Sequence, residues 1–154
     1  MSTTSTTSSK KDFKKMSFRD LVVWQQSYDF AKGVHALTRQ LPQEERYALT
    51  SQLTRGAFSM PVQIAQGQRK WAKADFVKHL NYARNSSFEC ETYLLLIADL
   101  FSEFKDEAEK LVEANTIIQK MLSALIYTIE HPKNKNYESK KETVEEPQIV
   151  AVTA

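Results

Sequence analysis

The hydrophobic residues of this chain recur at helical spacing, and the longest such pattern lies between residues 75 and 104. Positions there alternate at intervals of four and three residues, which places them on one side of a single helix. They are Phe76, Leu80, Ala83, Ser87, Cys90, Leu94, Ile97, Phe101 and Phe104. A second apolar row lies beside the first and comprises Val77, Phe88, Leu95 and Ala98. A helix that is apolar on two adjoining faces is expected to be an inner member of a bundle.

Three further helices are predicted around this one. The first begins after Ser17, which can cap it, and stops at Pro42. Its two apolar rows form a wide arc, so one edge is expected to face another subunit; they are Leu21, Trp24, Tyr28, Ala31 and His35, and Val23, Phe30, Val34 and Leu37. A histidine on such a row is interpreted as a core or interface residue, because no second metal-binding residue is near it in sequence.

The second predicted helix begins near residue 43, and Pro61 is expected to kink it. Its apolar row is Thr50, Leu53, Ala57, Met60, Ile64, Gly67 and Trp71. The fourth helix is expected over residues 106–130 and is stopped by Pro132. Its row is Leu111, Ala114, Ile118, Met121 and Leu125, with Leu122, Ile126 and Ile129 alongside.

These elements predict an all-α fold, an antiparallel up-down-up-down four-helix bundle over residues 17–131. The few turn-forming residues, Gly 3 and Pro 4, favour long helices over a turn-rich β fold. Residues 1–16, rich in Ser, Thr and Lys, and the polar residues 132–154 are interpreted as disordered tails.

Composition is that of one soluble domain, with 42% hydrophobic and 26% charged residues among 154. No run of about 18 apolar residues is present, so no membrane span is expected. The N-terminus lacks the features of a secretory signal, and a lone cysteine fits a reducing compartment, which together favour a cytoplasmic protein. Cys90 lies on the apolar row of residues 75–104, so we expect a buried thiol.

Candidate chemistry is sparse, and we expect no enzyme activity, cofactor or metal. The sequence has no glycine-rich phosphate loop, no metal-ligand spacing and no nucleophile–histidine–acid set. Glu89 and Glu91 are two residues apart on a helix, so they cannot share a proton; one is expected to pair with Arg55 across the bundle. The inward Glu and Glu-x-x-His pattern of di-iron bundles is absent.

The charge is divided unevenly, which is the main pointer to a partner. Residues 1–88 carry 14 Lys and Arg against 6 Asp and Glu, a net +8, whereas residues 89–154 carry 7 against 13, a net −6. This asymmetry indicates an anionic partner at a basic surface, pairing between subunits, or pairing of helix faces within the bundle. Cations near Trp71 and Tyr82 are candidates for binding nucleic acid; they are Arg55, Arg69, Lys70, Lys73, Lys78 and Arg84. For Trp71, burial on the second helix and stacking on a base both remain open.

Several segments together resemble a known family. They are FRDLVVWQQSYDFA, LPQEERYALTSQLTRGAFSMPVQIAQGQRK and FVKHLNYARNSSFECETYLLLIADL, which lie within residues 18–100. In their motifs and order they are similar to the four-helix-bundle proteins found in intervening sequences of bacterial 23S rRNA genes. Gln63 and Gln66 stand where that family has Asn and Glu, and Asn85 and Ser86 stand where it has Gly-Ser.

The resemblance implies a homo-oligomer, most simply a pentameric ring. A related branch is the accessory variability protein of diversity-generating retroelements, which binds nucleic acid and assists a reverse transcriptase. We therefore expect a non-enzymatic oligomer that binds RNA or DNA or assists a reverse transcriptase. The alternative is a structural protein–protein interaction module without nucleic acid, in which the wide apolar arcs serve only assembly.

Overall fold

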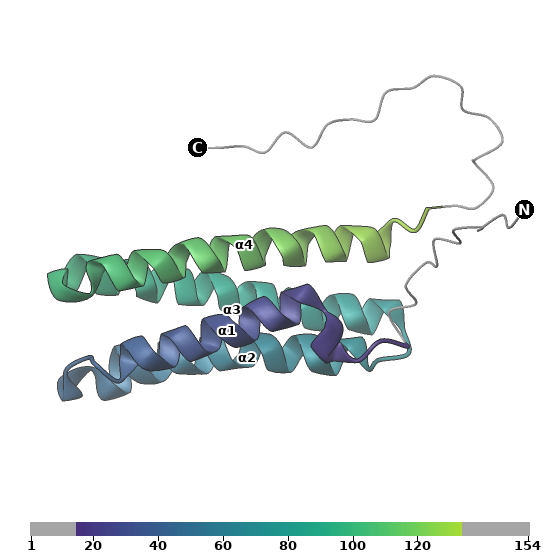
Figure 1. The fold of residues 1–154 in the computed structure, drawn as a ribbon. Coiled ribbons are helices and arrows are strands. Elements are labelled where there is room, and N and C mark those ends of the chain that lie inside the picture. Colours follow the sequence, from purple (N-terminus) through teal and green to yellow (C-terminus); the bar gives the residue numbers. More distant parts are fainter. Residues whose placement is uncertain (1–14, 134–154) are drawn as a thin grey trace, which may run out of the picture.

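The computed structural model describes residues 15–133, which form four α-helices joined by short connections (Figure 1). The helices are α1 (Val22–Thr38), α2 (Ser51–Gln68), α3 (Lys73–Leu100) and α4 (Lys105–Glu130). Each helix runs antiparallel to the next, and α4 also contacts α1, which closes the arrangement. The predicted all-α four-helix bundle is therefore confirmed. The tails predicted at residues 1–16 and 132–154 lie almost wholly outside the described residues.

The apolar row that opened the sequence analysis forms the α3 side of the core. From Phe76 to Ile97 every member of that row is buried, and Leu94 and Cys90 are fully enclosed. The single helix predicted to extend to residue 104 ends earlier, at Leu100, because Phe101 is extended, with φ −126° and ψ 91°. A 3₁₀ turn, Ser102–Phe104, then leads into α4, which leaves the last two members of the row only partly buried.

The first helix begins later than its capping signal predicts. Ser17 accepts a hydrogen bond from the backbone N–H of Arg19, but it caps a 3₁₀ turn, Phe18–Asp20. Leu21 is extended, and α1 starts only after it. The row containing Phe30 faces the core, whereas His35 on the other row is exposed on the bundle surface, with its ring centre 6.2 Å from that of Phe58. His35 is therefore not a core residue, and its place at an interface between subunits stays a prediction.

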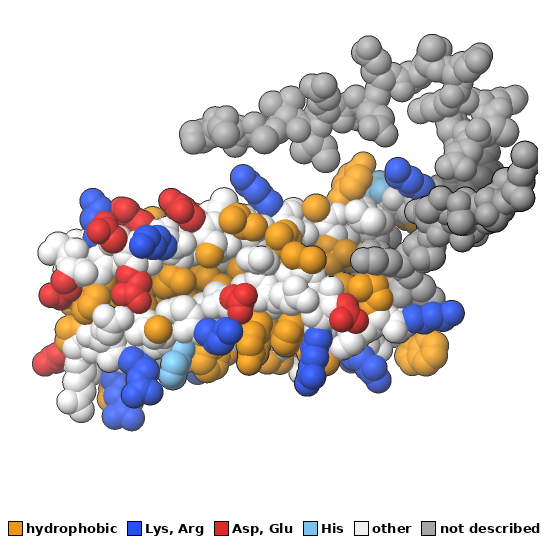
Figure 2. All heavy atoms as spheres, viewed as in Figure 1, with side chains coloured by type: hydrophobic (Ala, Val, Ile, Leu, Met, Phe, Trp, Pro, Cys, Tyr) orange, Lys and Arg blue, Asp and Glu red, His pale blue; other side chains and the backbone are white. Residues whose placement is uncertain are grey.

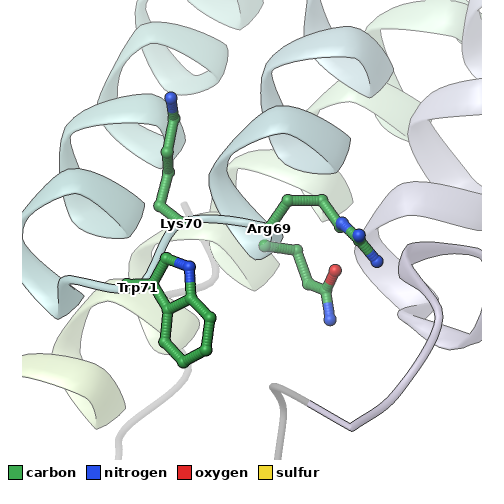
Figure 3. A pocket seen from close by; sticks show the side chains of 4 residues that line it. Arg69, Lys70 and Trp71 are labelled. Carbon is green, nitrogen blue, oxygen red and sulfur yellow. The ribbon is translucent and has the colours of Figure 1, made fainter.

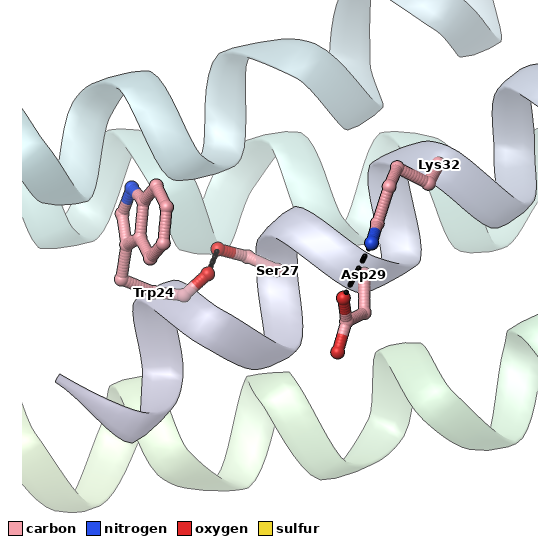
Figure 4. Close-up of polar contacts among 4 residues, drawn as sticks. All are labelled: Trp24, Ser27, Asp29 and Lys32. Atoms are coloured by element: carbon pink, nitrogen blue, oxygen red, sulfur yellow. Dashed lines mark hydrogen bonds and ion pairs between the residues drawn. The ribbon is translucent and has the colours of Figure 1, made fainter. Parts of the chain in front are cut away.

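Figure 4 shows the two sides of α1. The buried Ser27 donates its hydroxyl hydrogen bond to the carbonyl of Trp24, 2.9 Å away, so the hydroxyl is satisfied inside the core. Toward solvent, the Lys32 ammonium lies 3.0 Å from the Asp29 carboxylate. Both of these side chains are well exposed, so this ion pair adds little to stability.

The second and third helices approach each other closely where their residues are small. A Cβ atom added to Gly56 would lie 2.9 Å from the Cys90 sulfur, and one added to Gly67 would lie 2.7 Å from the Cβ of His79. A 3₁₀ turn, Gln43–Glu45, and a π-helical turn, Arg46–Thr50, precede α2, which then continues through the buried Pro61. Small residues thus allow α2 and α3 to pack closely at these positions.

The core side of α4 differs from the predicted row by about one residue. Its buried residues are Ala108, Asn115, Ile118, Leu122 and Ile126. Most members of the predicted row, including Met121 and Leu125, are only partly buried. The shift arises because α4 packs more extensively on α3 than on α1. Figure 2 shows the consequence as a band of hydrophobic side chains along the seam between α4 and α1. None of the described helices combines the length and apolarity needed to cross a membrane.

Candidate nucleic-acid interface

The connection between α2 and α3 holds the most closely grouped cations among the candidates. The last turn of α2 closes with a hydrogen bond of 3.0 Å from the Lys70 N–H to the Gly67 carbonyl. Ala72 is extended and acts as the N-cap of α3, which begins at Lys73 without any side-chain cap. Arg69, Lys70 and Lys73 are therefore held within one short turn of the chain, and all three are exposed.

Trp71 lies in the middle of this connection and is 88% exposed. Its proposed place on the apolar row of α2 is wrong, because that helix ends at Gln68 and the helical register does not extend to residue 71. The indole instead lines an open hollow together with Gln68, Arg69 and Lys70. Figure 3 shows the Lys70 side chain and the indole leaving the connection in opposite directions.

The fold adds further cations to this connection that sequence reasoning missed. The Gln68 side-chain amide donates a hydrogen bond of 2.5 Å to the Met16 carbonyl, which brings the N-terminal segment beside the end of α2. Exposed Lys15 and Arg19 therefore lie at this end, and α4 also finishes there, shortly before Lys133. We call this end of the bundle the basic end; its cations are Lys15, Arg19, Arg69, Lys70, Lys73 and Lys133. Acidic residues are fewer there and comprise Asp20, Asp75 and Glu130.

The opposite end of the bundle carries the opposite charge, and we call it the acidic end. Its carboxylates are Glu44, Glu45, Asp99, Glu103, Asp106, Glu107, Glu109 and Glu113. Its cations are fewer and comprise Arg39, Arg46, Lys105 and Lys110. Several of these acids lie in the first turns of α4, where the helix dipole favours negative charge. The charge of the bundle is thus separated along its length, and in Figure 2 most of the red side chains lie toward one end, with blue side chains among them.

The remaining predicted cations do not join the basic end equally. Lys78 follows on α3, exposed, with its ammonium 5.9 Å from the ring centre of Tyr82. Arg84 lies further along α3 and is half-buried, where it donates hydrogen bonds to the side chains of Asn81 and Ser123. Arg55 is exposed, but 14 residues of α2 separate it from Arg69, about 20 Å along the helix axis. The structure therefore groups Arg69, Lys70 and Lys73 and leaves Arg55 and Arg84 apart.

The carboxylates of α3 do not form the predicted ion pair. Glu91 accepts a hydrogen bond of 2.9 Å from the Gln119 side-chain amide on α4. Neither Glu89 nor Glu91 lies within ion-pairing distance of Arg55; the ion pairs found within residues 15–133 are Asp29–Lys32 and Lys105–Glu109. The expected pairing is therefore wrong; Glu91 bonds to α4, whereas Arg55 lies on α2.

The other reactive side chains have structural surroundings. Burial raises the pKa of the Cys90 thiol to about 12, so the thiolate is scarce at neutral pH. His79 shares a hydrogen bond of 2.7 Å with the Gln63 side chain. Over residues 15–133, no three His, Cys, Asp or Glu side chains are grouped so as to hold a metal ion.

The sequence pattern of the 23S rRNA-intervening sequence protein family matches residues 19–124, which span α1, α2, α3 and most of α4. The chain belongs to this family. This family member is also similar to the crystal structure of a protein with unknown function from the S23 ribosomal protein family of Bacteroides thetaiotaomicron. The two are 24% identical with a TM-score of 0.63, over 68% of this chain and 98% of that chain, which shows a shared fold. No curated protein matches the chain.

Proposed function

We propose that this member of the intervening sequence protein family is a non-enzymatic homo-oligomer that binds RNA or DNA at its basic end. The observation that carries the proposal is the separation of charge along the bundle. Arg69, Lys70 and Lys73 are exposed together and form no ion pair with any described carboxylate. A phosphate can therefore approach them without displacing an existing partner, and its binding releases counterions.

The homo-oligomer rests on apolar surface that one bundle leaves exposed. Tyr28 is 47% exposed and stacks on Trp24, with their ring centres 5.0 Å apart. Phe58 and Val62 on the neighbouring helix α2 are also exposed. Exposed hydrophobic residues grouped on adjoining helices are typical of an interface between proteins. The family resemblance favours a pentameric ring, in which five basic ends on one side would add their modest affinities by multivalency.

Binding to short oligonucleotides, followed by fluorescence anisotropy at low salt, tests this proposal. Changing Arg69, Lys70 and Lys73 to Glu should weaken binding strongly while the oligomer stays intact. The matched control changes Arg39, Arg46 and Lys110 to Glu, which alters the net charge equally but at the acidic end. Equal losses in the two variants, or no binding by the intact oligomer, would refute a site at the basic end.

An accessory role beside a reverse transcriptase is the finer form of this proposal and rests on the resemblance to the retroelement accessory proteins. A reverse transcriptase gene next to the gene for this chain would support it. The enzyme should then be retained by immobilised oligomer in the presence of nucleic acid. If the variant with Glu at residues 69, 70 and 73 still retained the reverse transcriptase, contact between the enzyme and the oligomer would not require the basic end.

A second candidate function is a protein–protein interaction module without nucleic acid. It is favoured by exposed hydrophobic residues on α3, where Phe88, Leu95 and Leu100 are each about half exposed or more. Under this alternative the oligomer forms, but adding it at low salt does not change the fluorescence anisotropy of the RNA or DNA oligonucleotides. The same titration therefore decides between the two candidates.

A further inference from the structure

We propose that Trp71 is a stacking platform for an unpaired base, so that the basic end takes single-stranded nucleic acid in preference to a duplex. This inference rests on the proposed function, because the phosphates of the same strand would lie on the neighbouring cations. Compared with the proposed function, it specifies single-stranded nucleic acid as the class of ligand and Trp71 as the residue that contacts the bases. Neither follows from the charge of the basic end alone.

The exposure of Trp71 is the first observation. At 88% it is the most exposed large hydrophobic side chain of residues 15–133. A side chain this exposed is accessible to a ligand, and the flat π face of an indole matches the face of any base. Because the connection is fixed at both ends by helices that pack on each other, the ring is presented from a defined place.

The surroundings of the indole are the second observation. Trp71 shares its hollow with Gln68, Arg69 and Lys70, and Lys73 follows two residues later. In Figure 3 the Arg69 side chain extends from the same short connection that carries the indole, and Lys70 extends from its opposite side. A stacked base has a phosphate on each side of it along the strand, and cations precede and follow Trp71 in the same way. In a duplex the base faces are already stacked on each other, so only an unpaired base can use the indole fully.

Tyr47 provides an internal comparison at the other end of the bundle. It is 84% exposed, and the Arg46 guanidinium lies 5.9 Å from its ring centre. However, Glu44 and Glu45 precede it, and it lies at the acidic end, where phosphates are repelled. Tyr47 is therefore an exposed aromatic residue beside an arginine that should not bind a nucleic acid strand, which makes it a matched control for Trp71.

The direct test compares two strands that differ only in their bases. The intact oligomer is titrated with a labelled oligothymidylate and with an abasic strand of the same length, which keeps the phosphates. For each stacked base we expect the abasic strand to bind about 5- to 150-fold more weakly. Trp71→Ala should weaken oligothymidylate binding by a similar factor and remove the difference between the strands.

Companion variants separate stacking from other uses of the side chain. Trp71→Phe should keep most of the preference for oligothymidylate, whereas Trp71→Leu should behave as Trp71→Ala. A leucine that works as well as tryptophan would instead indicate a hydrophobic contact with a protein, and would overturn the inference. Tyr47→Ala should leave both affinities unchanged, and an equal loss in that variant would also overturn it. Because Trp71 is exposed, the melting temperature of Trp71→Ala should match that of the wild-type chain.

Trp71 can also report on stacking by its own fluorescence. The chain has two tryptophans, so Trp24→Phe leaves Trp71 as the single emitter. Its emission should resemble that of tryptophan in water and should be quenched as oligothymidylate binds. The midpoint of the quenching titration should equal the midpoint measured by anisotropy. Binding without quenching, or equal affinity for the thymidylate and abasic strands, would refute base stacking while the proposed function stands. Failure to bind either strand would refute both.

Discussion

Truncation of Leu94 to alanine tests the packing of the bundle most sharply. Leu94 is fully buried on α3, between Cys90 and Ile97, which are fully buried as well. The change removes three carbon atoms, which corresponds to about 2.4 kcal/mol of lost transfer free energy at about 0.8 kcal/mol for each carbon. Close packing on all sides prevents full collapse of the space left behind, and the cavity adds to the cost. We expect the free energy of unfolding to fall by about 3–4 kcal/mol.

The neighbouring residue offers a matched control for this prediction. Leu95 is 48% exposed on the same helix, so Leu95→Ala should change the free energy of unfolding by well under about 1 kcal/mol. Both variants are measured by urea denaturation at the same protein concentration, because stability of an oligomer depends on concentration. A loss below about 1 kcal/mol in Leu94→Ala, or equal losses in the two variants, would refute the helical register of α3.

Three other predictions concern the cysteine, the helix contact and assembly. Burial raises the pKa of the Cys90 thiol to about 12, so this thiol ionises at a lower pH in the unfolded chain than in the folded one. The contribution of Cys90 to the free energy of unfolding is therefore complete below about pH 8, and it falls as pH rises beyond 9, by up to about 1.4 kcal/mol per pH unit. Denaturation curves of Cys90→Ala should lack this part of the pH dependence. Gly56→Ala should destabilise the bundle by about 1–3 kcal/mol, because the added Cβ would lie 2.9 Å from the Cys90 sulfur. Adding Cys90→Ala to the same chain should relieve part of that cost, which a double-mutant cycle measures. Light scattering at micromolar concentration should show a homo-oligomer, with a pentamer as the expected mass, and a monomer would leave the exposed Tyr28 and Phe58 without an explanation.

Helical spacing was sufficient to predict the bundle because the core-facing residues of α3 recur without interruption from Phe76 to Ile97. Helix ends were predicted less well. Phe104 continues the spacing of α3, yet the chain leaves the helix after Leu100, where Phe101 is extended and a 3₁₀ turn follows. Burial of Trp71 on α2 was left open for the same reason, because its spacing fits a helix that has already ended at Gln68.

The candidate site was predicted in part. Arg69, Lys70 and Lys73 are close in sequence, so their grouping follows directly from the chain. The contribution of Lys15 and Lys133 depends on the antiparallel arrangement and on the hydrogen bond from Gln68 to Met16, which no local pattern indicates. In the sequence, net positive charge lies in residues 1–88 and net negative charge in residues 89–154. In the folded chain, positive and negative charge are instead separated between the basic end and the acidic end of the bundle.

The salt dependence of nucleic-acid binding tests the proposed basic end most directly. Affinity is measured by anisotropy over a range of salt concentrations for the wild-type chain and for the variant with Glu at residues 69, 70 and 73. Affinity falls as salt rises, and each phosphate contact adds about 0.7 to 0.9 to the steepness of log affinity plotted against log salt concentration. Losing three contacts should therefore reduce the steepness of that plot by about 2 to 3 for each bound subunit. Slopes that are equal in the wild-type and variant proteins would contradict binding through Arg69, Lys70 and Lys73.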